Sequence, residues 1–345
     1  MSEPKRIRIL IVDDSAFVRK AVRRMLEADP ELAVVGEAAD GMRGLALAKT
    51  LEPDVITLDL QMPGWDGLDT LARVMDEAPT SVVILSSFAQ AGADLTLRAL
   101  TTGAVEFVDK SRVTTMALYE LERELVNKIK AAASSSPQAG IPDTGAGVAA
   151  RPRTELFVLG ASTGGPRALQ AILGRLPVLS TTSILVVQHM PAGFTRALAE
   201  RLDHTCAMPV GELEPNATLE LGQVHVAPGG ADLQLERSAD KTHVAIRSRP
   251  RGRRTTPSID LALETAIACH GERVCAVILT GMGDDGLEGG RAVRTAGGCV
   301  IAEAASTCVV YGMPRTVTEA GLASAVAPLE EIPALMLALA GEPRR

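Results

Sequence analysis

Short apolar runs that alternate with longer amphipathic stretches dominate this sequence, on both sides of one break in its composition. The first half holds such runs at Ile7–Val12, Ala33–Glu37, Val55–Leu58, Val82–Leu85 and Ala104–Val108. Stretches with helical periodicity separate them, such as Phe17–Ala28 and Gly41–Leu51. Apolar runs separated in this way are typical of buried strands in a parallel sheet. We therefore expect an α/β fold, with a doubly wound five-stranded parallel sheet in the N-terminal half.

The second half repeats this alternation. Its helix-separated apolar runs lie at Leu156–Leu159, Ile184–Gln188, Val274–Thr280 and Cys299–Ala302. Three further runs follow one another without an intervening helix, at Gln223–Ala227, Leu233–Glu236 and His243–Arg247. We expect a second doubly wound α/β domain, in which a mostly parallel sheet carries a small antiparallel insertion formed by those three runs.

One segment, residues 131–153, interrupts the alternation. It is rich in Ala, Gly, Pro and Ser and has no periodicity, a composition that buries too little apolar surface to order itself. The chain has 345 residues, more than a single hydrophobic core usually organises. We predict a first domain at 1–130, a flexible linker at 131–153 and a second domain at 154–345.

The composition argues against several classes of protein. A net charge of -7 and only 2% aromatic residues argue against nucleic-acid binding, which relies on basic surfaces and aromatic stacking. No segment approaches the roughly 20 apolar residues that span a bilayer, and the polar N-terminus does not resemble a secretory signal, so we expect no membrane insertion. The five cysteines include no C-x-x-C pair, which indicates reduced thiols. The sequence therefore predicts a cytoplasmic protein.

Polar side chains follow four of the five apolar runs in the first half. Asp13 and Asp14 follow the first run, Asp59 the third, Ser86 the fourth and Lys110 the fifth. Ligands of open α/β sheets bind at the carboxyl ends of strands, where these residues would meet. Carboxylates suit Mg²⁺, and a lysine with a hydroxyl suits a phosphoryl group, so a carboxylate here is a candidate phosphoacceptor. Taken singly, Asp14 or Ser15 could instead cap the following helix and Asp59 could begin a loop.

These positions also resemble a known family. Asp13-Asp14-Ser15, Asp59-x-x-Met62-Pro63-x-x-Asp66-Gly67, Ser86 and Lys110 are similar to the response-regulator receiver family, over about residues 5–130. The resemblance implies that a histidine kinase phosphorylates Asp59. It also implies that Ser86 and Lys110 contact the phosphoryl group. Mg²⁺ would be held by Asp13, Asp14, Asp59 and the backbone carbonyl of Gln61.

A candidate nucleophile lies after the first apolar run of the second half. Ser162 occupies the turn Gly160-Ala161-Ser162-Thr163-Gly164, which fits the G-x-S-x-G pattern, although such a turn can also bind phosphate or only change direction. His189 follows the next run, and Asp284 and Asp285 follow the third. Serine, imidazole and carboxylate would then share one sheet edge, as a Ser-His-Asp relay requires. Their order along the chain differs from that of the α/β-hydrolases, and spacing alone does not choose between the two aspartates.

Several motifs in the second half resemble one family. The segments GASTGGP, QHMP, LTGMGDDG and VYGMPR, with VAPGG and PSID, are similar to the catalytic domain of the chemotaxis methylesterases, over about residues 156–337. The family's G-x-D-G pattern falls on Asp285. The resemblance implies a Ser162 nucleophile acting on glutamate methyl esters of chemoreceptors, with His189 as base and Asp285 orienting it, and no cofactor. It further implies an oxyanion hole near Thr163 and Met282, deamidation of glutamines, and inhibition by the receiver that phosphorylation relieves.

A second hypothesis is a response regulator with a non-catalytic output domain. In that case the turn at Gly164-Gly165 would hold a nucleotide, or the arginine-rich run Arg247–Arg254 would hold DNA. Neither a helix-turn-helix pattern nor a G-x-G-x-x-G with a following acidic residue supports it. In an esterase the same run would be a solvated loop, or a basic region that steers the enzyme to acidic receptor helices.

Overall fold

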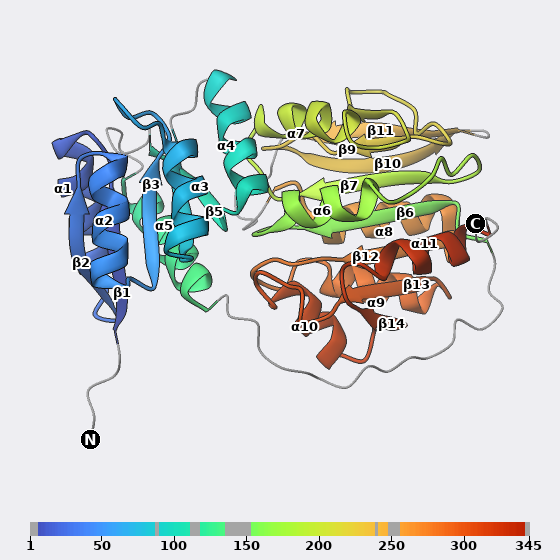
Figure 1. The fold of residues 1–345 in the computed structure, drawn as a ribbon. Helices are drawn as coiled ribbons and strands as arrows, with labels where there is room; N and C mark the ends of the chain where they lie inside the picture. Colours follow the sequence, from blue (N-terminus) through green and yellow to red (C-terminus); the bar gives the residue numbers. More distant parts are fainter. Residues whose placement is uncertain are drawn as a thin grey trace. The chain divides into compact units, whose positions relative to one another are not determined.

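The computed structural model describes residues 6–86, 90–110, 118–134, 153–238, 241–247 and 256–341. The chain divides into two compact units, Met1–Ser136 and Pro137–Arg345 (Figure 1). Residues 135–152 of the expected linker lie outside the described residues, as do residues 248–254 of the arginine-rich run. None of the described helices is long and apolar enough to cross a membrane.

The first unit is a five-stranded parallel sheet with the strand order β2-β1-β3-β4-β5, as predicted (Figure 1). Its elements are β1 (Ile7–Val12), α1 (Ala16–Glu27), β2 (Leu32–Ala38), α2 (Gly41–Leu51), β3 (Val55–Asp59), α3 (Gly67–Glu77), β4 (Ser81–Ser86), α4 (Gln90–Thr102), β5 (Glu106–Asp109) and α5 (Leu118–Ala133). Helix α5 extends three residues beyond the expected end of the first domain, Lys130.

Local sequence signals set where these helices begin. Ser15, Asp40 and Asp66 are the N-caps of α1, α2 and α3, and each side chain accepts a hydrogen bond from a backbone N–H of the first turn. Helices α1 and α5 pack together over one face of the sheet, where Leu26 and Leu125 join its core. Helix α3 contacts both α2 and α4 on the other side. The sheet is thus covered on both faces, which explains why its central strands β1, β3 and β4 are mostly apolar.

The second unit is built on a seven-stranded parallel sheet with the order β14-β13-β12-β6-β7-β9-β8. Its elements are β6 (Leu156–Ala161), α6 (Gly165–Leu173), β7 (Ser183–Gln188), α7 (Phe194–Asp203), β8 (Val210–Glu212), β9 (Val224–Val226), β10 (Asp232–Ser238), β11 (Lys241–Arg247), α8 (Ile259–His270), η2 (Gly271–Arg273), β12 (Val274–Ile278), α9 (Leu287–Thr295), β13 (Cys299–Glu303), α10 (Met313–Glu319), β14 (Ala325–Ala327) and α11 (Ile332–Ala340). The α/β architecture agrees with the prediction.

The antiparallel insertion is smaller than expected. Among the strands that the structure describes, β10 and β11 are the two that pair antiparallel, with Leu235 opposite Val244. The run Gln223–Ala227 was expected to belong to it, and that expectation is wrong. Strand β9 instead pairs in parallel with β7 and β8, because helix α7 and the following segment carry the chain back to the same end of the sheet.

The order of strands changes direction at β6, and this decides where a site can form. Strand β7 lies on one side of β6 and β12 on the other, so the chain winds outward in both directions from the centre. Helices α8, α9 and α10 bury Leu263, Val293 and Val317 in one core, to which the β10–β11 pair contributes Leu235. In such sheets the carboxyl ends of the strands at the change of direction border a crevice suited to ligands.

Candidate functional site

Three adjacent strand ends bring the candidate esterase residues together. Ser162 follows β6, His189 follows β7, and the loop that contains Asp285 follows β12. Backbone hydrogen bonds join the three ends: the N–H of His189 donates to Ala161 (3.0 Å), and the N–H of Ser162 donates to Thr280 (3.0 Å). The edge predicted from the sequence therefore forms.

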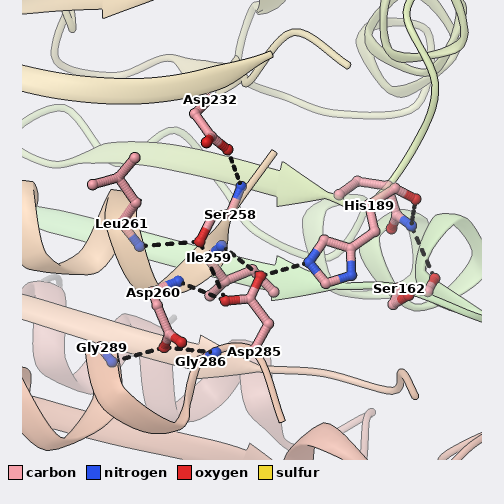
Figure 2. Close-up of polar contacts among 11 residues, drawn as sticks. Ser162, His189, Asp232, Ser258, Ile259, Asp260, Leu261, Asp285, Gly286 and Gly289 are labelled. Atoms are coloured by element: carbon pink, nitrogen blue, oxygen red, sulfur yellow. Dashed lines mark hydrogen bonds and ion pairs between the residues drawn. The ribbon is translucent and has the colours of Figure 1, made fainter. Parts of the chain in front are cut away.

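His189 and Asp285 are in direct contact. Nε2 of His189 lies 2.7 Å from Oδ2 of Asp285, and both side chains are largely buried. Figure 2 shows the imidazole between Asp285 and Ser162. An ionised carboxylate only accepts hydrogen bonds, so this contact places the ring proton of neutral His189 on Nε2. The other nitrogen, Nδ1, is buried without a hydrogen-bond partner in the described part of the chain, and therefore holds a lone pair suited to a base.

The N-terminus of α8 holds the Asp285 carboxylate. Its Oδ2 accepts from the N–H of Ile259 (2.8 Å), and its Oδ1 accepts from the N–H of Asp260 (3.0 Å). The hydroxyl of Ser258 lies 3.4 Å from Oδ1. Burial alone would raise the pKa of Asp285, but His189 and these two N–H groups together hold it below the ordinary aspartate value. Asp284, by contrast, is exposed to solvent.

The turn that carries Ser162 is fixed from two sides. The side-chain amide of Gln188 donates to the carbonyls of Ser162 (2.9 Å) and His189 (3.2 Å), so it ties the two candidate catalytic residues together. On the other side the backbone of Gly281 approaches so closely that a Cβ there would lie 2.7 Å from Cβ of Ser162. A glycine is therefore required at this position.

One candidate oxyanion residue, Thr163, lies in this turn, and the other, Met282, lies in the loop after β12. Thr163 is buried, and its carbonyl accepts a hydrogen bond from the hydroxyl of Thr280 (2.9 Å). Met282 directly follows Gly281 and exposes 41% of its surface. The turn leads into α6, whose first residues Gly165 and Pro166 are buried. The positive end of that helix dipole therefore lies beside Ser162, which favours a developing negative charge there.

Some residues of this site were not predicted from the sequence. Ser258, Ile259 and Asp260 were noted only as part of a motif, and Gln188 only as the end of a strand. Ser258 before an apolar helix is a recognisable N-cap, and the structure shows it in that role. Nothing in the sequence indicates that this helix begins against the Asp285 loop.

The first unit gathers its predicted residues at the carboxyl ends of β1, β3, β4 and β5. Carboxylate oxygens of Asp13, Asp14 and Asp59 lie within 4.8 Å of one another. Nζ of Lys110 lies 2.5 Å from Oδ2 of Asp59 and 3.4 Å from Oδ2 of Asp13. Asp13 and Asp59 are almost fully buried, whereas Asp14 is exposed. The cluster therefore has one face open to solvent.

Charge is crowded in this cluster. Burial raises the pKa of Asp13, the Lys110 ammonium lowers it, and the charge of Asp59 raises it again, with a net increase. Hard oxygen ligands of this kind fit Mg²⁺, which would relieve the excess of negative charge. Ser86 lies at the end of β4, and its hydroxyl receives a hydrogen bond of 2.8 Å from Thr96 on α4. The backbone N–H of Gln61 donates to Asp59 (3.0 Å).

Comparison with known proteins yields matches along almost the whole chain. The family model for the CheB methylesterase matches residues 157–336, and that for the response regulator receiver domain matches residues 9–119. A protein-glutamate methylesterase/protein-glutamine glutaminase of Symbiobacterium thermophilum is 43% identical over 97% of this chain and 98% of its own length. One of the same description from Myxococcus xanthus is 44% identical over 96% of this chain and 97% of its own length.

A solved structure matches the second unit. The crystal structure of the Thermotoga maritima CheB methylesterase catalytic domain is 41% identical, with a TM-score of 0.53, and covers 54% of this chain and 98% of that domain. Both resemblances drawn from the motifs are confirmed by these matches. The hypothesis of a non-catalytic output domain is disfavoured, because the methylesterase model covers the residues that such an output would occupy.

Proposed function

The chain belongs to the CheB methylesterase family, with a receiver domain ahead of the methylesterase domain, and we propose that it hydrolyses glutamate methyl esters on chemoreceptors through Ser162, His189 and Asp285. The observation that carries the proposal is the 2.7 Å contact between His189 and Asp285 beside the Ser162 turn. That contact leaves Nδ1 of His189 as the nitrogen available to a nucleophile.

The reaction follows the logic of a serine hydrolase. Nδ1 of His189 takes the proton of the Ser162 hydroxyl as Oγ attacks the γ-carbonyl of the ester. The tetrahedral oxyanion is stabilised by backbone N–H groups near Thr163 and Met282, and by the start of α6. The imidazolium, which Asp285 supports, then gives its proton to the departing methanol. Water attacks the acyl-enzyme in the same way, and releases the glutamate and the free serine.

Glutamine side chains of receptors are the second proposed substrate. An amide forms the same tetrahedral intermediate, and the proton on His189 is then transferred to the leaving nitrogen. Ammonia is the product that leaves. Because an amide nitrogen that has not been protonated is a poorer leaving group than an alkoxide, we expect deamidation to be slower than demethylation. Two relatives carry both activities in their names.

Labelling with a serine-reactive fluorophosphonate tests the nucleophile. The full chain should be labelled at Ser162, and Ser162→Ala should not be labelled. Ser180→Ala is the matched control, because Ser180 is an exposed serine of the same domain outside the site, and it should be labelled normally. Undiminished labelling of Ser162→Ala would show that another residue is the nucleophile.

The receiver domain is proposed to control this activity through phosphorylation of Asp59 by a histidine kinase. Asp13, Asp14, Asp59 and the carbonyl of Gln61 would hold Mg²⁺, which supplies neutralisation of the phosphoryl charge when bound. Lys110 and Ser86 would contact the phosphoryl oxygens. The close approach of the three carboxylates to one another supports this assignment.

Phosphorylation by a small phosphodonor or a phosphorylated kinase tests the receiver. Incorporation should require Mg²⁺ and should disappear in Asp59→Asn. Asp69→Asn is the matched control, because Asp69 is an exposed aspartate in the first turn of α3, away from the cluster. Stable incorporation into Asp59→Asn at the wild-type level would contradict the assignment.

A further inference from the structure

Asp285 of the candidate triad and Asp260 beside it each bind the N-terminus of the helix to which the other is attached. Asp285 directly precedes Gly286, the N-cap of α9, yet its carboxylate accepts from the backbone N–H groups of Ile259 and Asp260 at the start of α8. Asp260 lies in the first turn of α8, and its carboxylate points the opposite way. Its Oδ1 lies 2.8 Å from the nitrogen of Gly286 and 2.7 Å from that of Gly289 (Figure 2). Asp285 thus binds the start of α8, and Asp260 binds the start of α9.

These hydrogen bonds supply acceptors for N–H groups at the starts of α8 and α9. The first N–H groups of a helix have no partner within it, and the helix dipole favours negative charge beside them. The N-cap of α9 is Gly286, which has no side chain to accept a hydrogen bond, so Asp260 provides the acceptor. The two helices pack closely here, since a Cβ on Gly289 would lie 2.7 Å from Cβ of Leu263 and 3.0 Å from Cα of Asp260.

We propose that Asp260 is a positioning residue for the esterase reaction. By binding the start of α9 it fixes the loop that carries Asp285, and through Asp285 it fixes the imidazole of His189. This inference rests on the proposed function of Ser162, His189 and Asp285. Asp260 itself accepts from the backbone N–H groups of Gly286 and Gly289 and acts through Asp285, without touching the substrate.

The arrangement is kept in spite of an electrostatic cost. Burial and the neighbouring charge of Asp285 raise the pKa of Asp260 to about 6, against the N–H groups of Gly289 and Gly286, which lower it. In the facing loop after β12, the charge of Asp285 raises the pKa of Asp260. His189 in turn contacts Asp285. A single acceptor oxygen binds both N–H groups, so an asparagine oxygen can replace it without the charge.

Turnover of methylated chemoreceptor by the full chain tests whether Asp260 is a positioning residue. The kcat is expressed per site titrated by fluorophosphonate, because unfolded protein is then not counted. Asp260→Ala should lower kcat by about 10- to 100-fold with KM nearly unchanged, the loss expected from a small displacement of a catalytic group. Asp260→Asn should stay within about threefold of the wild type, since it keeps the acceptor. Asp260→Glu, a second variant should Asp260→Ala fold poorly, displaces the oxygen and should also lower kcat. Glu288→Ala, an exposed change in the first turn of α9, is the control and should have no effect.

A double variant separates positioning from an independent role. If Asp260 acts through Asp285, adding Asp260→Ala to Asp285→Ala should cause no further loss of kcat. A further tenfold loss there would overturn the proposal, as would unchanged kcat in Asp260→Ala and Asp260→Glu, or a loss in Asp260→Asn equal to that in Asp260→Ala. Full activity of Asp285→Ala would instead refute the proposed triad, and with it the inference that rests on it.

Discussion

The substitution Asp285→Asn discriminates most sharply between the two neighbouring aspartates of the loop after β12. An asparagine has one acceptor oxygen, whereas the Asp285 carboxylate uses both: Oδ2 faces Nε2 of His189 and the N–H of Ile259, and Oδ1 faces the N–H of Asp260. With the NH₂ group at the Oδ2 position, the proton of His189 must move to Nδ1, and the base is lost. With the NH₂ group at the Oδ1 position, a donor faces the N–H of Asp260. Each arrangement also loses the charge that supports the imidazolium.

The size of the effect follows from these contacts. A buried donor left without its acceptor costs about 1–3 kcal/mol of stability. The wrong tautomer in a Ser-His-Asp relay lowers kcat by about 10⁴-fold, or about 5.5 kcal/mol of activation free energy. Methanol release per mole of folded protein should therefore fall by about 10⁴-fold in Asp285→Asn, whereas Asp284→Asn, a change at an exposed neighbour, should stay within about threefold. A larger loss in Asp284→Asn than in Asp285→Asn would refute the assignment.

Three further predictions concern regulation, pH and the nucleophile turn. The fragment 153–345 should be more active than the unphosphorylated full chain, by about 100-fold if the inhibited state is favoured by about 2.7 kcal/mol, and equal activities would exclude inhibition by the receiver. Because the folded state raises the pKa of Asp260 to about 6, its contribution to stability is present below about pH 4 and is lost as the pH rises through 6. In urea unfolding, the free energy of unfolding of Asp260→Asn should therefore gain on that of the wild type as the pH rises from about 4 to 7, and identical pH dependence would contradict a raised pKa at Asp260. Gly281→Ala should lower kcat at least about tenfold by displacing Ser162, whereas Gly211→Ala, where a Cβ meets no neighbour, should not; normal turnover in Gly281→Ala would contradict the close approach.

Much of the fold followed from apolar runs and their spacing. Strand β1 and helix α2 have the predicted bounds, because a buried strand and a helix begun by an Asp N-cap both carry strong local signals. The short strands β8 and β14 were not predicted, since each has three residues and too few to show a period. Strand β9 was assigned to the wrong sheet, because its partner is chosen by the crossover that precedes it and not by its own residues.

The same contrast, between features with a local sequence signal and features set by packing, applies to the residues of the candidate sites. Ser162, His189 and Asp59 directly follow or end apolar strands, so the rule that sites form at strand ends was enough to find them. Asp260 lies 25 residues before Asp285 in the sequence and inside a helix, where an acidic residue in the first turn has an ordinary local explanation. Its role depends on the packing of α8 against α9, which no local pattern specifies.

Release of methanol from a chemoreceptor bearing labelled methyl esters tests the central claim most directly. The full chain should release methanol, and Ser162→Ala should reduce the rate by about 10⁴- to 10⁶-fold while the protein still binds the receptor. His189→Ala should cause a loss of the same order, because neither residue works without the other. Methanol release by Ser162→Ala at a rate near that of the wild type would contradict the account.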